Sequence, residues 1–366
     1  MMKGAKEISS AIKKIFVTFV IVLSQLSNYG QARPDLSSFK DRLQPVDESS
    51  FFKTEGYYNW CPSILKTKNG VYHLFYSRWK KEYGFGGWLT HSEIAHAVSN
   101  KPTGPWKLVG TVLSGAGSGH WDAITAHNPR IEYFDGKYYL YYIATNTGNK
   151  AFSEKDRTEW AKASNANPNR NALRNNQRVG VAVAGHINGP YQRMDHPIIE
   201  PSGPITHITT NPAIVQGKDK RYYLIVKGDK PGNTKFIRNQ AIAVSTSPVG
   251  PFEMQPKPVI DYLDTEDMST WYDKKRDYYY GIFHSTEGFI GLVSSPDGIN
   301  WNKAHDFVVM PKQLKMKNGE VRKYDSMERP FIFVSDNEPK VLSLALKKGD
   351  DSFLVFIPIK PASKNK

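Results

Sequence analysis

The sequence predicts an all-β fold, a five-bladed β-propeller with four-stranded blades around a central channel. Five stretches share one pattern, in which a polar or proline-containing start precedes two aromatic strands and a tight turn. A third strand follows four of them, and most close with a short fourth strand. No helical periodicity separates the units, which is typical of propellers. A two-sheet sandwich is the alternative, but it would not explain this self-similarity.

The five units follow one another from blade one to blade five. Third strands are expected at "SEIAHAVS", "RVGVAVAG", "QAIAVSTS" and "FIGLVSSP". The fifth unit shows fewer strands, so residues 36–52 are expected to supply a strand that closes the ring. The units begin with "NWCPSILKTKNGVYHLFYSRW", "AHNPRIEYFDGKYYLYYIATN", "TTNPAIVQGKDKRYYLIVKGD", "DTEDMSTWYDKKRDYYYGIFH" and "DSMERPFIFVSDNEPKVLSLAL".

Residues 1–32 have the form of a secretory signal peptide. Lysines precede an apolar stretch, Ile15 to Leu23, and a small-x-small site ends at Ala32. The apolar stretch is short for a membrane span, although an N-terminal anchor is the alternative. We therefore expect an exported protein, periplasmic or extracellular, with no membrane span in the mature chain. Residues 33–50 form an N-terminal segment that closes the last blade, and 51–360 form the propeller.

Charge and cysteine content restrict the partners. Cys61 is the only cysteine, which excludes an intrachain disulfide and a cysteine-based zinc cluster. It is interpreted as a small buried residue rather than a nucleophile. The formal net charge of +14 favours an anionic partner. For an exported protein, an acidic or sulfated polysaccharide or oligosaccharide is a better prediction than nucleic acid.

The polar start of each unit has a geometric explanation. In a propeller the first strand of each blade lines the central channel, so five distant segments meet at one end of it. Acidic, amide and arginine side chains around such a pit, edged by tryptophans, would suit a sugar. The candidate substrate-binding residues are Trp60, Trp121, His127, Asn128, Arg130, Arg178, Asn211, Asp267, Trp271, Glu328 and Arg329.

The motifs "CPSI", "NPRI", "NPAI", "TEDM" and "ERPF" before aromatic strands, with closings such as "PTGPW", resemble glycoside hydrolases of family 43 and its relatives. Families 32, 68, 62 and 117 share that architecture. The resemblance covers roughly residues 50–358 and implies a five-bladed fold. It also implies an inverting hydrolase of plant or algal polysaccharides or their oligosaccharides, with a base, an acid and a third carboxylate that tunes the acid. We expect exo action.

The family's catalytic positions are only partly kept. Its base falls on Cys61-Pro62-Ser63, its tuning aspartate on Asn211-Pro212-Ala213, and its acid on Glu266-Asp267-Met268. Glu266 is therefore the predicted general acid, in an apolar or negatively charged surrounding. Asp122 is the first candidate for the base and Glu93 the second. A family 117-like arrangement would bring in His127 or His284, and a non-catalytic glycan-binding propeller is the alternative function.

Several of these residues have structural interpretations as well. Glu328-Arg329 is either a ligand clamp or an ion pair that fixes the last blade. His127 either contacts a neighbouring strand or helps to hold an ion in the channel. Arg178 either reaches substrate or braces Asp122, and Asp267 either faces the ligand or caps a turn. No cofactor is predicted, and a channel ion such as calcium stays open as an alternative.

Two long connections are expected to wall the pit. Residues 146–178 interrupt the second unit, and their middle predicts a short helix. Loops of that length usually have a role such as a lid or pocket wall, with a disordered insertion as the alternative. The excess of basic residues in this segment again favours an anionic glycan. The segment 80–88, "KKEYGFGGW", is expected to build the other wall.

Overall fold

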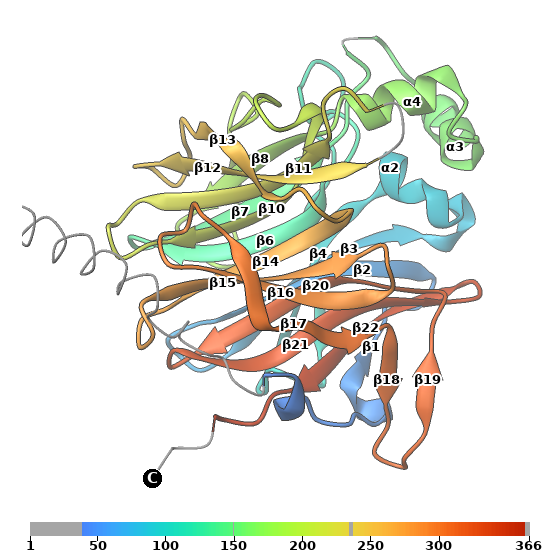
Figure 1. Ribbon diagram of the computed structural model, residues 1–366. Coiled ribbons are helices and arrows are strands. Elements are labelled where there is room, and N and C mark those ends of the chain that lie inside the picture. Colours follow the sequence, from blue (N-terminus) through green and yellow to red (C-terminus); the bar gives the residue numbers. More distant parts are fainter. Residues whose placement is uncertain (1–38, 149, 234–236, 363–366) are drawn as a thin grey trace, which may run out of the picture. The chain divides into compact units, whose positions relative to one another are not determined.

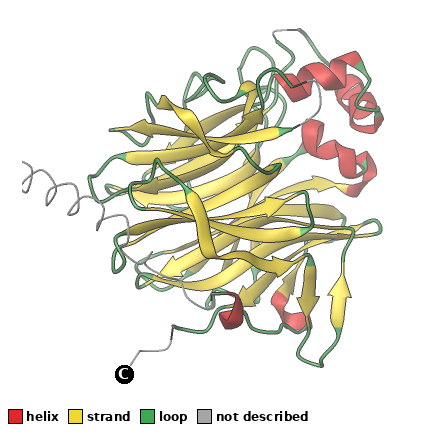
Figure 2. Ribbon diagram, viewed as in Figure 1, coloured by secondary structure: helices red, strands yellow, loops and turns green. Residues whose placement is uncertain are grey.

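Five four-stranded antiparallel sheets form the blades of a β-propeller in the computed structural model (Figure 1). The structure describes residues 39–148, 150–233 and 237–362. Strands dominate the described residues, with helices confined to a few connections (Figure 2). The predicted all-β propeller with four-stranded blades is therefore confirmed. The predicted signal peptide, residues 1–32, lies outside the described residues.

Each of the first four blades uses consecutive strands, and the fifth takes its outer strand from the residues that precede blade 1. That outer strand is β1 (Phe51–Phe52), which pairs with β22 (Asp351–Pro358). The other strands are β2 (Tyr57–Lys66), β3 (Tyr72–Lys80), β4 (Glu93–Ser99) and β5 (Lys107–Leu113) in blade 1; β6 (His127–Phe134), β7 (Lys137–Ala144), β8 (Arg178–Ala184) and β9 (Gln192–Arg193) in blade 2; β10 (Thr206–Gln216), β11 (Tyr222–Asp229), β12 (Arg238–Ser245) and β13 (Glu253–Ile260) in blade 3; β14 (Thr265–Asp273), β15 (Tyr278–Ser285), β16 (Phe289–Ser295) and β17 (Asn302–Pro311) in blade 4; and β20 (Ser326–Ser335) and β21 (Glu338–Lys348) in blade 5.

The first strand of every blade is irregular at the same place. Its register with the second strand shifts there, as between Trp60 and Ser63 in blade 1. One residue in each shift has a φ between 53° and 61°, a left-handed conformation that is uncommon outside glycine. Bulges of this kind re-aim a side chain. The five left-handed residues are Cys61, Asn128, Asn211, Asp267 and Arg329.

Aromatic and aliphatic side chains pack between neighbouring blades. Phe75 of blade 1 and Leu140 of blade 2 belong to one buried cluster, and Trp79 and Phe356 join blades 1 and 5 in another. Full burial of each such side chain contributes about 1.5–3 kcal/mol. The tyrosine-rich second strands are largely core, and Tyr141 is fully buried.

The insertion in blade 2 forms two helices rather than the single one expected. A capping box at Ser153 begins the first helix, and Asn167 caps the second. Within the described parts of the chain, no helix has the length and apolar character needed to cross a bilayer. The remaining elements are α2 (Trp88–His91), α3 (Glu154–Lys162), α4 (Pro168–Asn175), the short helices η2 (Lys40–Arg42), η3 (Glu48–Ser50), η4 (Lys81–Tyr83) and η5 (Phe85–Gly87), and the hairpin β18 (Gln313–Lys315) and β19 (Val321–Lys323).

Candidate active site

A cleft with a volume of about 350 Å³ lies at the end of the propeller where the first strands begin. Side chains from blades 1 to 5 and from helix α4 meet in it. Both connections that were predicted to wall the pit contribute residues. The lining residues are Trp60, Trp79, Phe85, Trp88, Leu89, His127, Asn165, Arg170, Asn171, Arg174, Gln177, Ile208, Lys227, Arg238, Glu266, Glu328 and Arg329.

At the bulge of each first strand, two neighbouring residues face different places, one the central channel and the other, in four blades, the cleft. The left-handed residue of every blade lines the narrow central channel. The residue before it lines the cleft in four of the five blades, as Trp60, His127, Glu266 and Glu328. The predicted meeting of the five strand starts is therefore confirmed. The side chains divide between channel and cleft because adjacent residues of a strand point in different directions.

Blade 1 gives the cleft an aromatic wall. The ring of Phe85 packs edge-on against Trp60, with 5.3 Å between ring centroids. Trp88, at the start of α2, lies 5.4 Å from the imidazole of His127. Broad aromatic faces are suited to stacking against the apolar face of a sugar ring.

His127 is buried at the base of this wall. Its Nδ1 lies 2.7 Å from the Ser92 hydroxyl, and its Nε2 lies 3.5 Å from Cys61 Sγ. Burial lowers the pKa of His127 well below its ordinary value, and the Arg329 charge adds to this. Burial also raises the pKa of the Cys61 thiol to about 12. Cys61 and His127 therefore lack the thiolate needed for nucleophilic catalysis, and His127 supports a neighbouring strand.

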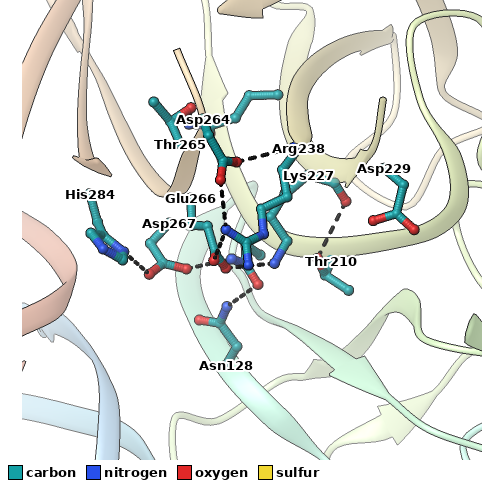
Figure 3. Close-up of polar contacts among 12 residues, drawn as sticks. Asn128, Thr210, Lys227, Asp229, Arg238, Asp264, Thr265, Glu266, Asp267 and His284 are labelled. Atoms are coloured by element: carbon teal, nitrogen blue, oxygen red, sulfur yellow. Dashed lines mark hydrogen bonds and ion pairs between the residues drawn. The ribbon is translucent and has the colours of Figure 1, made fainter. Parts of the chain in front are cut away.

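Blade 3 gives the cleft a cationic wall, in which two side chains converge on Glu266 (Figure 3). Lys227 Nζ lies 2.6 Å from Glu266 Oε2, and Arg238 Nη1 lies 3.0 Å from Glu266 Oε1. Arg238 is also held by Asp264, which accepts hydrogen bonds from its backbone N–H and from the same Nη1, both at 3.0 Å.

These cations correct the expected surrounding of Glu266. Burial alone would raise the pKa of its carboxyl, but the charges of Lys227, Arg238, Arg329 and His284 together lower it well below its ordinary value. The predicted apolar or negative surrounding is wrong. The prediction failed because both blade 3 cations come from the second and third strands, from which no residue was assigned to acid tuning. In this state Glu266 is a carboxylate, whereas a general acid must carry a proton.

Glu328 is the second carboxylate that lines the cleft. Its carboxylate makes no hydrogen bond or ion pair with any residue that the structure describes, so the predicted alternative of an ion pair between Glu328 and Arg329 is wrong. Arg329 instead pairs with Asp267 across the channel. The carboxylate of Glu328 is thus available to a ligand, although no prediction gave it a catalytic role.

A polar network fills the channel and links four blades. Asn128 Nδ2 donates to Asn211 Oδ1 at 3.0 Å, and the Asn211 amide donates to Asp267. Asp267 also pairs with Arg329 and accepts its backbone N–H at 3.3 Å. These residues were predicted to bind substrate. Their polar groups bind one another instead, because the bulges point them at the propeller axis.

Asp267, His284 and Glu328 place their potential ligand atoms within 4.8 Å of one another, which tests the predicted alternative of a channel ion. The surroundings do not fit calcium, which requires six to eight oxygen ligands. Lys312 Nζ lies 2.6 Å from His284 Nε2, and the Arg329 guanidinium contacts Asp267. Lys312 and Arg329 thus already bind two of the three side chains that would have to bind the metal ion.

The inserted helices extend the cationic side of the cleft. Arg174 of α4 pairs with Asp229, at the end of β11. Arg170 donates to the carbonyl oxygens of Trp160, at 2.9 Å, and Gly86, at 3.2 Å, which ties the insertion to blade 1. Among the residues that the structure describes, five cationic side chains and two carboxylates line the cleft.

Neither predicted base lines this cleft. The Asp122 carboxylate accepts hydrogen bonds from Tyr142, at 2.7 Å, and Arg193, at 2.6 Å, beside a separate surface pocket. Glu93 accepts from Arg78 at 2.7 Å and from Thr111 at 2.8 Å, inside blade 1. Both carboxylates already accept hydrogen bonds from other side chains of the protein. These partners are distant in sequence, so the pairing could not be predicted from the sequence.

Four other predicted binding residues have structural partners outside the cleft. Trp121 donates to the Met194 carbonyl beside the separate pocket, and Trp271 is buried against Phe39 and Tyr280. Arg130 spans the channel to donate to Ser269 at 2.9 Å. Arg178 pairs with Glu200 at 2.6 Å, so Arg193 rather than Arg178 braces Asp122.

The two cations of blade 3 were not predicted from the sequence. Lys227 and Arg238 stand at the cleft ends of the second and third strands, next to residues that are core. A signal was present, since a lysine interrupts the apolar run "YYLIVKGD" near its end. The aromatic residue Trp79 was missed for the same reason, because it also lies on a second strand.

No protein-family model and no curated protein sequence matches the chain. Solved structures match it in fold. Zg3597, a family 117 glycoside hydrolase of the marine bacterium Zobellia galactanivorans, is 16% identical, with 86% of this chain and 89% of that chain covered and a TM-score of 0.58. The endo-arabinase of Bacteroides thetaiotaomicron VPI-5482 is 13% identical, with 87% and 98% covered and a TM-score of 0.54. The GH43_1 enzyme from Xanthomonas citri, complexed with xylose, is 13% identical, with 88% and 90% covered and a TM-score of 0.55. The chain thus has the five-bladed fold of family 43 and 117 glycoside hydrolases.

Proposed function

We propose that this protein is a glycoside hydrolase that acts on oligosaccharides bearing a uronate carboxylate or a sulfate ester. One observation carries the proposal, namely that a single cleft combines an aromatic wall, two carboxylates and five cationic side chains. The fold shared with glycoside hydrolases supports it. The cleft volume of about 350 Å³ is at the small end for ligand pockets, which supports exo action on short oligosaccharides.

Glu266 and Glu328 form the proposed catalytic pair. Glycoside hydrolysis with inversion needs one carboxylic acid that protonates the leaving oxygen and one carboxylate that activates water. Glu266 occupies the position of the family's acid, and Glu328 replaces Asp122 and Glu93 as the base because it lines the cleft without a partner among the described residues. Trp60 and Trp88 would hold the sugar ring.

A non-catalytic glycan-binding propeller is the second candidate. It is favoured by the ion pairs that keep Glu266 charged and by Cys61 and Asn211 at two positions where the family has carboxylates. The two functions predict the same ligands but different turnover, so an activity assay separates them.

The test is hydrolysis of a panel of neutral, uronate-containing and sulfated oligosaccharides, followed by mass spectrometry. We expect turnover of anionic members only, and Glu266→Gln should lower kcat about 100-fold or more, as expected for loss of a general acid. The matched control is Glu200→Gln, which removes an exposed carboxylate outside the cleft. Activity on neutral arabinan alone would refute the anionic substrate. Binding without turnover of any member would establish the glycan-binding function.

We also propose that the protein is exported and that its mature chain begins near Arg33. The lysine-rich start and the apolar stretch that follows support this. N-terminal sequencing of material recovered outside the cytoplasm is the test, and retention of Met1 would contradict it.

A further inference from the structure

Lys227 and Arg238 differ in how firmly they are held. Arg238 is fixed by Asp264 through a backbone and a side-chain hydrogen bond. Lys227 Nζ contacts only Glu266 among the residues that the structure describes. Both side chains line the cleft. The two cations therefore form a preformed oxyanion site that a carboxylate of the protein now occupies.

Glu266 cannot act as an acid while it occupies that site. Cationic groups face it from several elements, namely Lys227 on β11, Arg238 on β12, Arg329 on β20 and Lys312 directly after β17. The imidazole of His284 on β15 lies beside them. Its neighbour Asp267 forms an ion pair with Arg329 and therefore adds little negative charge beside Glu266. The positive surroundings keep the pKa of Glu266 low, so the proposed acid requires a change in its charge environment.

We infer that the acidic group of the substrate binds Lys227 and Arg238 in place of Glu266 and thereby frees Glu266 to take up a proton. This inference rests on the proposed function. A carboxylate or sulfate can accept hydrogen bonds from the lysine and the arginine at once. The Lys227 ammonium can turn toward it, since no other described group holds it. A second anion beside Glu266 favours its neutral form.

The proposed hydrolysis then proceeds with every proton and bond accounted for. The proton taken up from solvent passes from Glu266 to the glycosidic oxygen as its bond to the anomeric carbon breaks. Water forms the new bond to that carbon and gives its proton to Glu328. A neutral glycan would fill the aromatic wall but leave Glu266 charged. The acidic group would thus serve recognition and proton transfer together.

The first test is anion binding, which needs no turnover. Sulfate and glucuronate are titrated by calorimetry into the full chain at neutral pH. Lys227→Gln should weaken the Kd of the bound anion about 10-fold or more, because one charge-assisted hydrogen bond is lost. Glu266→Gln should tighten it by about the same factor, because the competing carboxylate is removed. The matched control, Lys218→Gln, removes an exposed lysine at the other end of the same hairpin and should change nothing.

The second test follows the carboxyl of Glu266 by carbon-13 NMR, with Glu266→Gln identifying its signal. Its pKa should rise when sulfate or glucuronate saturates the site, and the tighter anion identifies the substituent. Failure of both anions to bind, or binding that leaves Kd unchanged in both Lys227→Gln and Glu266→Gln, would overturn the inference. An unchanged Glu266 pKa at saturation would also overturn it. Absence of hydrolysis would instead count against the proposed function alone.

Discussion

Two adjacent positions on the first strand of each blade behave differently. The left-handed residue faces the channel, where Asn128, Asn211 and Asp267 satisfy one another. The residue before it faces the cleft, where Glu328 has no partner among the described residues. The channel position thus joins blades, whereas the cleft position is open to a ligand. A repeated backbone irregularity builds the fold, and the side chains placed one residue away from it build the site.

The largest effect is expected at the channel position. Asp267→Asn should lower the free energy of unfolding by about 3–5 kcal/mol, because the buried Arg329 guanidinium loses its counter-charge. Urea denaturation followed by tryptophan fluorescence measures this. The control Asp261→Asn changes an exposed aspartate of the blade 3 to blade 4 connection and should have little effect. Equal stability of the two variants would break the distinction between channel and cleft.

The cleft position should show the opposite pattern. Glu328→Gln should lower kcat about 100-fold or more, equivalent to about 2.7 kcal/mol of transition-state stabilisation. Its unfolding free energy should stay within about 0.5 kcal/mol of the wild type, since no described partner is lost. Steady-state kinetics and denaturation on the same preparation test both halves. A large loss of stability would show that Glu328 is structural.

A buried histidine pair in blade 1 tests whether stability also depends on polar groups outside both positions. Nδ1 of His73 lies 2.9 Å from Nε2 of His96. Burial lowers the pKa of each to about 4, and each imidazole is also affected by a neighbouring histidine. Their folded pKa lies below the unfolded value, so this stability is complete above about pH 6.5 and is lost as the pH falls to about 4, at up to about 1.4 kcal/mol per pH unit for each imidazole. Denaturation midpoints across this range should show the slope, and the double variant His73→Gln, His96→Gln should flatten it.

The smallest effect concerns the insertion that walls the cleft. Ser153→Ala removes the capping box of α3 and should cost that helix about 1 kcal/mol. Amide exchange in residues 154–162 should accelerate, and KM should rise because the wall loosens while kcat stays the same. Ser164→Ala, at an exposed serine between the two helices, is the matched control. Unchanged exchange in Ser153→Ala would show that the hydrogen bonds from Arg157 of α3 to the Thr90 carbonyl of α2, rather than capping, hold the wall.

Sequence repetition was sufficient for the blades and for the meeting of their starts. Polar or proline-containing starts, hairpin turns and tyrosine-rich strands recur in each unit, and these are local properties that a strand carries wherever it packs. The same repetition placed Trp60, His127, Glu266 and Glu328 at the cleft, because each occupies the same step of its repeat. It also placed Arg329 at the border between cleft and channel.

Only the tertiary structure decided which side chain meets which partner. Asp122 turned to Arg193 and Tyr142, and Lys227 turned to Glu266, through contacts between segments 20 to 71 residues apart. A bulge that rotates one residue toward the axis cannot be located from residue types alone, so Asn128 and Asn211 were assigned to the ligand rather than to each other. Composition alone, with a formal net charge of +14, predicted an anionic partner. The packing of blade 3 against blade 4 decided that Lys227 and Arg238 would pair with Glu266, a carboxylate of the protein itself.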